Sequence, residues 1–184
     1  MNEVYKPLGL LSITITWLTL AFLLVKWSPQ KGKSISQHAA ASKQAYFMMG
    51  IVETIVLPLF YLFIVKWFVP HFQLPRLFTV TVSLSALGFF IAAWIPDTQG
   101  WLSIVHRLWA YGSATLFIPA TTILCLSSNI SDTAKITSFI VLAYEIISLS
   151  LFFTTEKAKQ FHLYLQGGYI LLFHVLILTT VYTH

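Results

Sequence analysis

The sequence predicts an all-α integral membrane protein, a compact bundle of six transmembrane helices forming a single domain over residues 1–184. Only 9% of the residues are charged and 57% are hydrophobic, whereas a soluble domain carries roughly 25% charged residues. Six apolar runs each reach the length of about 20 residues that a helix needs to cross a bilayer. The runs are continuous rather than alternating, which favours helices over the strands of a barrel.

The first run covers residues 8–25, between Lys6 and Lys26. We expect it to be a retained span, because the small residues Ala39–Ala41 lie too far beyond it for a signal-peptidase site. The other spans are expected at residues 46–69, 77–95, 101–126, 134–153 and 161–182, with Pro70 and Pro96 after the second and third. Six spans place both termini on one side, and the loops after the first, third and fifth spans (the odd loops) on the other.

Ionisable residues inside a span indicate a functional site, because each costs about 2.5–3.5 kcal/mol to insert and therefore faces the bundle interior. Glu53 falls in the second span and Glu145 in the fifth. Asp97 lies in the turn before the fourth span, and His106 lies within the first two turns of that span. All four fall at a similar depth near the odd loops, so we expect them around one cavity, within about one helix diameter, roughly 10–12 Å.

Other polar residues of the same end complete the expected ligand-binding set: Ser36, His38, Arg107, His162 and His174. Each also has a structural interpretation. Asp97 is placed to cap the next helix, and Arg107 or His162 to lie at the membrane interface. The two glutamates and His174 are placed to form interhelical hydrogen bonds. The sequence leaves both interpretations open.

Several functions are disfavoured by what the sequence lacks. One cysteine, Cys125, excludes an intramolecular disulfide framework. No HxxxH, HExxH or Glu-x-x-His spacing occurs, so no metal site or cofactor is predicted. The net charge of +5 is not gathered in a basic tract, which argues against nucleic acid as a partner.

Our leading hypothesis is a membrane protein that holds a lipid or another amphipathic ligand at the polar cluster, where Arg107 and the lysines of the first loop suit an anionic head group. The alternative is a membrane-embedded hydrolase or metal-assisted enzyme that uses Asp97, His106 and the two intramembrane glutamates. We expect the chain in the bacterial cell membrane. A homo-oligomer or a membrane-protein partner stays open.

Three segments resemble a known membrane family. They are SISQHAAASKQAYFMMG (residues 34–50), IPDTQGWLSIVHRLWA (residues 95–110) and QGGYILLFHVLIL (residues 166–178). Together they resemble the domain-of-unknown-function family 998, which is similar in span count to the DRAM/Frag/Sfk group. The family has no assigned reaction, so the resemblance implies the six-span fold and points to Ser36, Asp97 and His106. Gln37 and His38 stand where the family more often has an acidic residue.

The charges of this chain and the family that it resembles favour opposite sides of the membrane for the odd loops. More of the lysines and arginines lie in or beside the odd loops than on the opposite side, which by the positive-inside rule favours cytoplasmic odd loops. The family that the segments resemble tends to carry its basic residues at the other end.

Overall fold

The apolar runs form helices throughout the computed structural model, which describes residues 3–27, 32–98, 100–154 and 160–183. Within these residues there is no strand, and six helical stretches are long and apolar enough to cross a membrane: Glu3–Lys26, Lys43–His71, Arg76–Ala93, Trp101–Leu126, Asp132–Thr154 and His162–Tyr182. The prediction of an all-α, six-span bundle is therefore confirmed. The chain is a multi-pass integral membrane protein, because its helices have the length and apolar composition that a bilayer requires. Within the bilayer each helix satisfies its own backbone hydrogen bonds.

The elements of the described chain follow one another with short connections. They are the 3₁₀ turn η1 (Glu3–Tyr5), α1 (Lys6–Lys26), α2 (Ile35–Ala40), α3 (Lys43–Phe63), the π-helical stretch η2 (Ile64–Phe68), α4 (Val69–His71), α5 (Arg76–Ala93), α6 (Trp101–Thr115), α7 (Phe117–Leu126), α8 (Asp132–Thr154) and α9 (His162–Tyr182). Two of the spans are composite: α3, η2 and α4 run on as one, and so do α6 and α7.

Local sequence explains where several helices begin or break. Ser34 and Gln37 form a capping box at the start of α2, and the Ser42 hydroxyl accepts a hydrogen bond from the backbone at the start of α3. The fourth span is interrupted at Leu116, three residues before Pro119. Proline has no N–H to offer the preceding turn, so a helix is weakened at that point.

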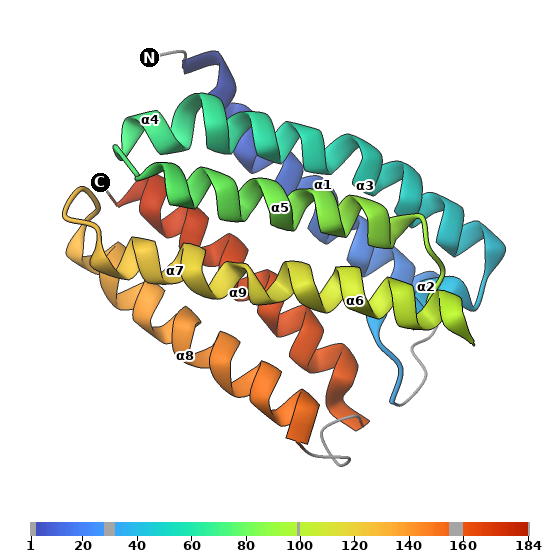
Figure 1. Cartoon of the computed structure of the whole chain (residues 1–184). Coiled ribbons are helices and arrows are strands. Elements are labelled where there is room, and N and C mark those ends of the chain that lie inside the picture. Colours follow the sequence, from blue (N-terminus) through green and yellow to red (C-terminus); the bar gives the residue numbers. More distant parts are fainter. Residues whose placement is uncertain (1–2, 28–31, 99, 155–159, 184) are drawn as a thin grey trace.

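The bundle places both termini at one end and α2 at the other (Figure 1). Along the chain α1 packs against α3, α3 against α5, α5 against α6 and α7, α7 against α8, and α8 against α9. At the end where the termini lie, the hydroxyls of Ser131 and Thr183 share a hydrogen bond. We call the opposite end the α2 end; α3, α6 and α9 begin there.

Burial differs between the two ends of the bundle. Near the termini the interior is filled by large apolar side chains, and Phe63, Trp67, Phe68, Phe72 and Phe78 are almost completely buried.

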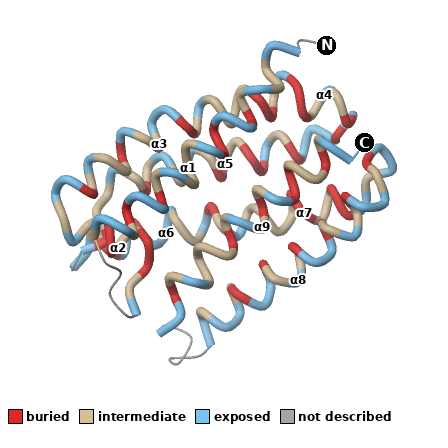
Figure 2. The backbone as a smooth tube through the Cα atoms, turned by 180° about the vertical axis from the view of Figure 1, so that it is seen from behind, coloured by how far each residue is buried: buried red, intermediate tan, exposed pale blue. Residues whose placement is uncertain are grey.

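Figure 2 shows exposed and buried stretches alternating along every long helix. The exposed faces carry large apolar side chains such as Leu18, Ile104 and Ile147, which suits contact with lipid.

Candidate functional site

A cavity of about 190 Å³ lies in the half of the bundle nearer the α2 end. Its walls come from α1, α2, α3, α5, α6, α7, α9 and the turn after α5. Most of the wall is apolar, with residues such as Leu20, Leu57, Phe60 and Phe173. Binding pockets of this kind, mostly apolar with a few polar groups, are typical of small-molecule sites.

The short helix α2 lies at the outer end of the cavity, with Ile35, Ser36 and Ala39 in the wall. The Ser36 hydroxyl lies 3.0 Å from the Ser34 hydroxyl. The backbone N–H of Ile35 donates to Gln166 Oε1 on α9 at 2.9 Å. Helix α2 is thereby attached to the far wall of the cavity that it covers.

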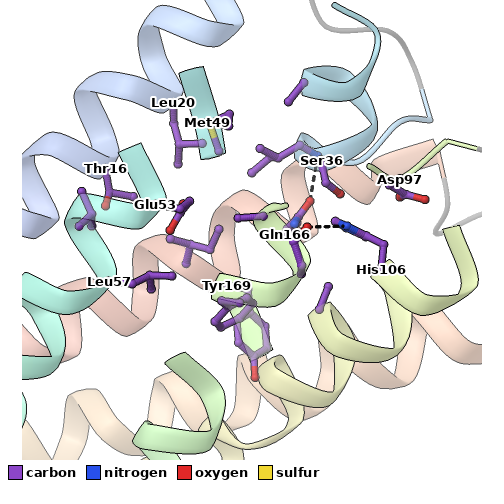
Figure 3. A pocket seen from close by; sticks show the side chains of 18 of the residues that line it. Thr16, Leu20, Ser36, Met49, Glu53, Leu57, Asp97, His106, Gln166 and Tyr169 are labelled. Carbon is purple, nitrogen blue, oxygen red and sulfur yellow. Dashed lines mark hydrogen bonds between the residues drawn. The ribbon is translucent and has the colours of Figure 1, made fainter. Parts of the chain in front are cut away.

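His106 lines the cavity from α6 and is held in one orientation by backbone carbonyls (Figure 3). Its Nδ1 lies 2.6 Å from the carbonyl oxygen of Ile95 and 3.0 Å from that of Ala92. A carbonyl only accepts hydrogen bonds, so Nδ1 carries the proton. In the neutral ring Nε2 is then an acceptor, and no side chain of the described residues donates a hydrogen bond to it.

Asp97 also lines the cavity and is almost fully buried. The Ser103 hydroxyl donates to its Oδ1 at 2.5 Å, and Arg107 Nε lies 3.4 Å from the same oxygen. Both partners belong to the first turns of α6, so Asp97 ties the turn to that helix. Arg107 itself is not part of the cavity wall, and its side chain is 49% exposed. A helix turns by about 100° per residue, so Arg107 cannot share the inward face of His106.

Glu53 enters the cavity from α3, on the side opposite His106 (Figure 3). No hydrogen bond or ion pair joins its carboxyl group to another described residue. The carboxyl group lies in the wall of a mostly apolar cavity within a membrane span. Glu53 is half-buried, and a carboxyl group without a partner in apolar surroundings costs free energy, so this side chain is available to a polar group of a ligand.

His174 lines the deeper part of the cavity. Its Nδ1 accepts a hydrogen bond from Trp17 Nε1 at 3.0 Å, which joins α9 to α1. The Phe60 ring packs edge-on against it, with 5.9 Å between ring centroids. His174 is therefore both an interhelical contact and a member of the cavity wall.

The expectation that both intramembrane glutamates share the cavity is wrong for Glu145. This residue lies on α8, which contributes nothing to the cavity wall. It is fully buried against α7, where the Thr121 hydroxyl donates to its Oε1 at 3.0 Å, and its Oε2 has no partner. Similar depth in the membrane did not bring Glu53 and Glu145 together, because α3 and α8 lie on different sides of the bundle.

The last two residues of the expected set lie beside the cavity rather than in it. His38 is buried on α2, and both of its ring nitrogens lack hydrogen-bond partners in the structure. His162 is buried at the start of α9, where its Nε2 lies 3.3 Å from Tyr111 Oη. Of the nine expected residues, the structure brings five together around the cavity: Ser36, Glu53, Asp97, His106 and His174.

Sequence reasoning missed Gln166, Tyr46 and Tyr169, which also line the cavity. Gln166 is the fifth residue of α9, within an apolar span. The cost of burying its amide was a signal of the same kind as for the glutamates. Among the described residues, no group of three or more His, Cys, Asp or Glu side chains is arranged to hold a metal ion.

Comparison of the chain with protein-family profiles, curated proteins and solved structures gives no match. The resemblance to family 998 therefore rests on the short sequence segments alone. The structure supports a six-span membrane protein.

Proposed function

We propose that the chain binds a single-chain amphipathic lipid in the cavity, with a neutral or amine-bearing head group that donates hydrogen bonds. The observation that carries the proposal is the Glu53 carboxyl group, which projects into a mostly apolar cavity and has no hydrogen-bond partner among the described residues. The membrane supplies such ligands, and we propose that it is the bacterial cell membrane.

The size of the cavity favours one alkyl chain. Pockets for drug-sized ligands measure about 300–1,000 Å³, and this cavity measures about 190 Å³. A cavity of this size favours a ligand with one alkyl chain over a two-chain phospholipid. The apolar wall between α1, α3 and α9 suits the alkyl chain, and the polar residues at the α2 end suit the head group.

The chemistry of the wall favours a head group that donates hydrogen bonds. Glu53 offers carboxyl oxygens and His106 offers Nε2 as an acceptor. No lysine or arginine of the described chain lines the cavity. The expectation of an anionic head group held by Arg107 therefore has no support in the wall, and hydroxyl or amine groups fit it better.

The test is to purify the protein in mild detergent and identify the lipid that it retains by native mass spectrometry. We expect a single-chain lipid with a hydroxyl or amine head group, and a loss of about tenfold or more in retained lipid for Glu53→Leu, since a buried head-group donor left without a partner costs about 1–3 kcal/mol. Glu145→Gln is the matched control, because that intramembrane glutamate lies outside the cavity. A preparation without lipid, or with anionic phospholipid alone, would overturn the proposal.

A second candidate is a hydrolase that adds water across an ester bond of the bound lipid. It is favoured by His106, whose Nδ1–H is held by carbonyls while Nε2 is left as a base, and by the Ser36 hydroxyl on the same cavity. Release of fatty acid from a monoacylglycerol by the purified protein, and its loss in His106→Ala, would establish the enzyme. Binding without release would leave the first proposal alone.

A further inference from the structure

A second, smaller cavity of about 80 Å³ adjoins the first on the side of α8 and α9. Five residues line both cavities: Phe89, Ala110, Gln166, Tyr169 and Ile170. A single layer of side chains therefore separates the two spaces. With only a methyl group, Ala110 is the smallest member of this partition.

The smaller cavity exists because α6 and α8 do not pack closely together. Helix α6 packs against α5 and α7, and α8 packs against α7 and α9. Figure 1 shows α8 diverging from α6 toward the α2 end, and Figure 2 shows the same divergence from behind. The gap between these helices faces sideways out of the bundle, toward the position of lipid.

Three side chains fill this gap: Tyr111 of α6, Phe152 of α8 and His162 of α9. The Tyr111 and Phe152 ring centroids are 4.6 Å apart, and those of Phe152 and His162 are 4.5 Å apart. Among the described residues, the hydrogen bond that joins two of these three side chains runs between Tyr111 Oη and His162 Nε2, over a long 3.3 Å. Rotation of these side chains would widen the gap without displacement of a helix.

We propose that this gap is the lateral entrance of the cavity, and that Tyr111, Phe152 and His162 form a side-chain gate through which the alkyl chain enters from the bilayer. The inference rests on the proposed function, in which the main cavity holds a single-chain lipid. It identifies how that ligand reaches its site and which residues control the rate.

The other end of the cavity is a poorer route for an alkyl chain. There α2 lies over the cavity, and the hydrogen bond from Ile35 to Gln166 holds it in place. A chain that left on that side would be exposed to water, at a free-energy cost that grows with each methylene group. Passage between α6 and α8 keeps it in apolar surroundings, because Tyr111 lies about 15 Å into its span at 1.5 Å per residue.

The gate is tested by kinetics in phosphatidylcholine vesicles that contain the full-length protein. The probe is a monoacylglycerol with a pyrene group on its acyl chain, and its uptake and release are followed by energy transfer from tryptophan. Ala114 lines the smaller cavity but not the main one. We expect Ala114→Phe to slow uptake and release about tenfold each, with Kd unchanged, because a blocked entrance affects both rates equally. Tyr111→Ala should accelerate both.

Leu108→Phe is the matched control, since it adds a ring on the exposed face of the same helix, where Leu108 is 70% exposed. Rates that stay at the wild-type value in both Ala114→Phe and Tyr111→Ala would overturn the gate and leave the binding proposal standing. A change in Kd without a change in the uptake rate would also overturn it. Wild-type protein that takes up no probe would instead overturn the proposed function. Elution volume and Tm of each variant establish that it is folded.

Discussion

Gln166 on α9 holds the first residue of α2, since its side-chain oxygen accepts a hydrogen bond at 2.9 Å from the N–H of Ile35, 131 positions earlier in the sequence. The N–H groups in the first turn of a helix have no partner within that helix. At α2 the Ser34 hydroxyl accepts the N–H of Gln37, and Gln166 accepts that of Ile35. A contact distant in sequence therefore determines where α2 lies over the cavity.

Loss of this hydrogen bond should uncover the cavity. In Gln166→Leu, with Cys125→Ser and Ser36→Cys as background, we expect maleimide to label position 36 about five times faster, because a hydrogen bond contributes about 1 kcal/mol. Gln166→Glu keeps an acceptor oxygen and should label at the original rate. Equal rates in the two variants would show that α2 is held by other contacts.

Thr121 stabilises the packing of α7 against α8. In Thr121→Val the buried Glu145 would keep no hydrogen-bond partner, because Oε1 would lose the one it has and Oε2 already has none. We expect the free energy of unfolding in detergent to fall by about 1–3 kcal/mol. Thr122→Val is the control, since the Thr122 hydroxyl bonds only to a carbonyl of its own helix. A larger effect at Thr122 would contradict this account.

Gly88 permits the close approach of α5 to α6. A Cβ atom at this position would collide with Ser113 Oγ and lie 3.3 Å from the Trp109 carbonyl oxygen. Gly88→Ala should therefore lower the free energy of unfolding by about 1–3 kcal/mol, the usual cost of overpacking. Added Ser113→Ala should recover part of the loss, and Gly112→Ala, which meets no atom within 4 Å, should not show it. Thermal unfolding in detergent measures all three variants.

Both ends of the described chain should label from the same face of the membrane. Lys6 Nζ lies 5.8 Å from the centre of the Tyr182 ring, so the start of α1 and the end of α9 are neighbours. With Cys125→Ser as background, we expect Lys6→Cys and Thr183→Cys to react with a membrane-impermeant maleimide from one side. Lys33→Cys, beside α2, should react from the other. Labelling of the first two from opposite sides would contradict the six-span arrangement.

The intramembrane polar residues show how far depth alone predicts a site. Position along a span follows from the number of residues, and it correctly suggested that Glu53 and His106 lie at one end of the bundle. The direction of a side chain follows from which helices are neighbours, and the sequence carries no such information for α3 and α8. Glu145 has a similar depth to Glu53 and a different neighbour, so it bonds to Thr121 instead of lining the cavity.

By itself the sequence determined that this is a six-span helical membrane protein, because the length and continuity of apolar runs set the structures that a bilayer tolerates. It also singled out the polar end where Ser36, Asp97 and His106 lie. Only the tertiary structure decided that α2 covers a cavity, that Gln166 belongs to its wall, and that a gap opens between α6 and α8. Those features depend on which helix packs against which, and one apolar face fits many neighbours.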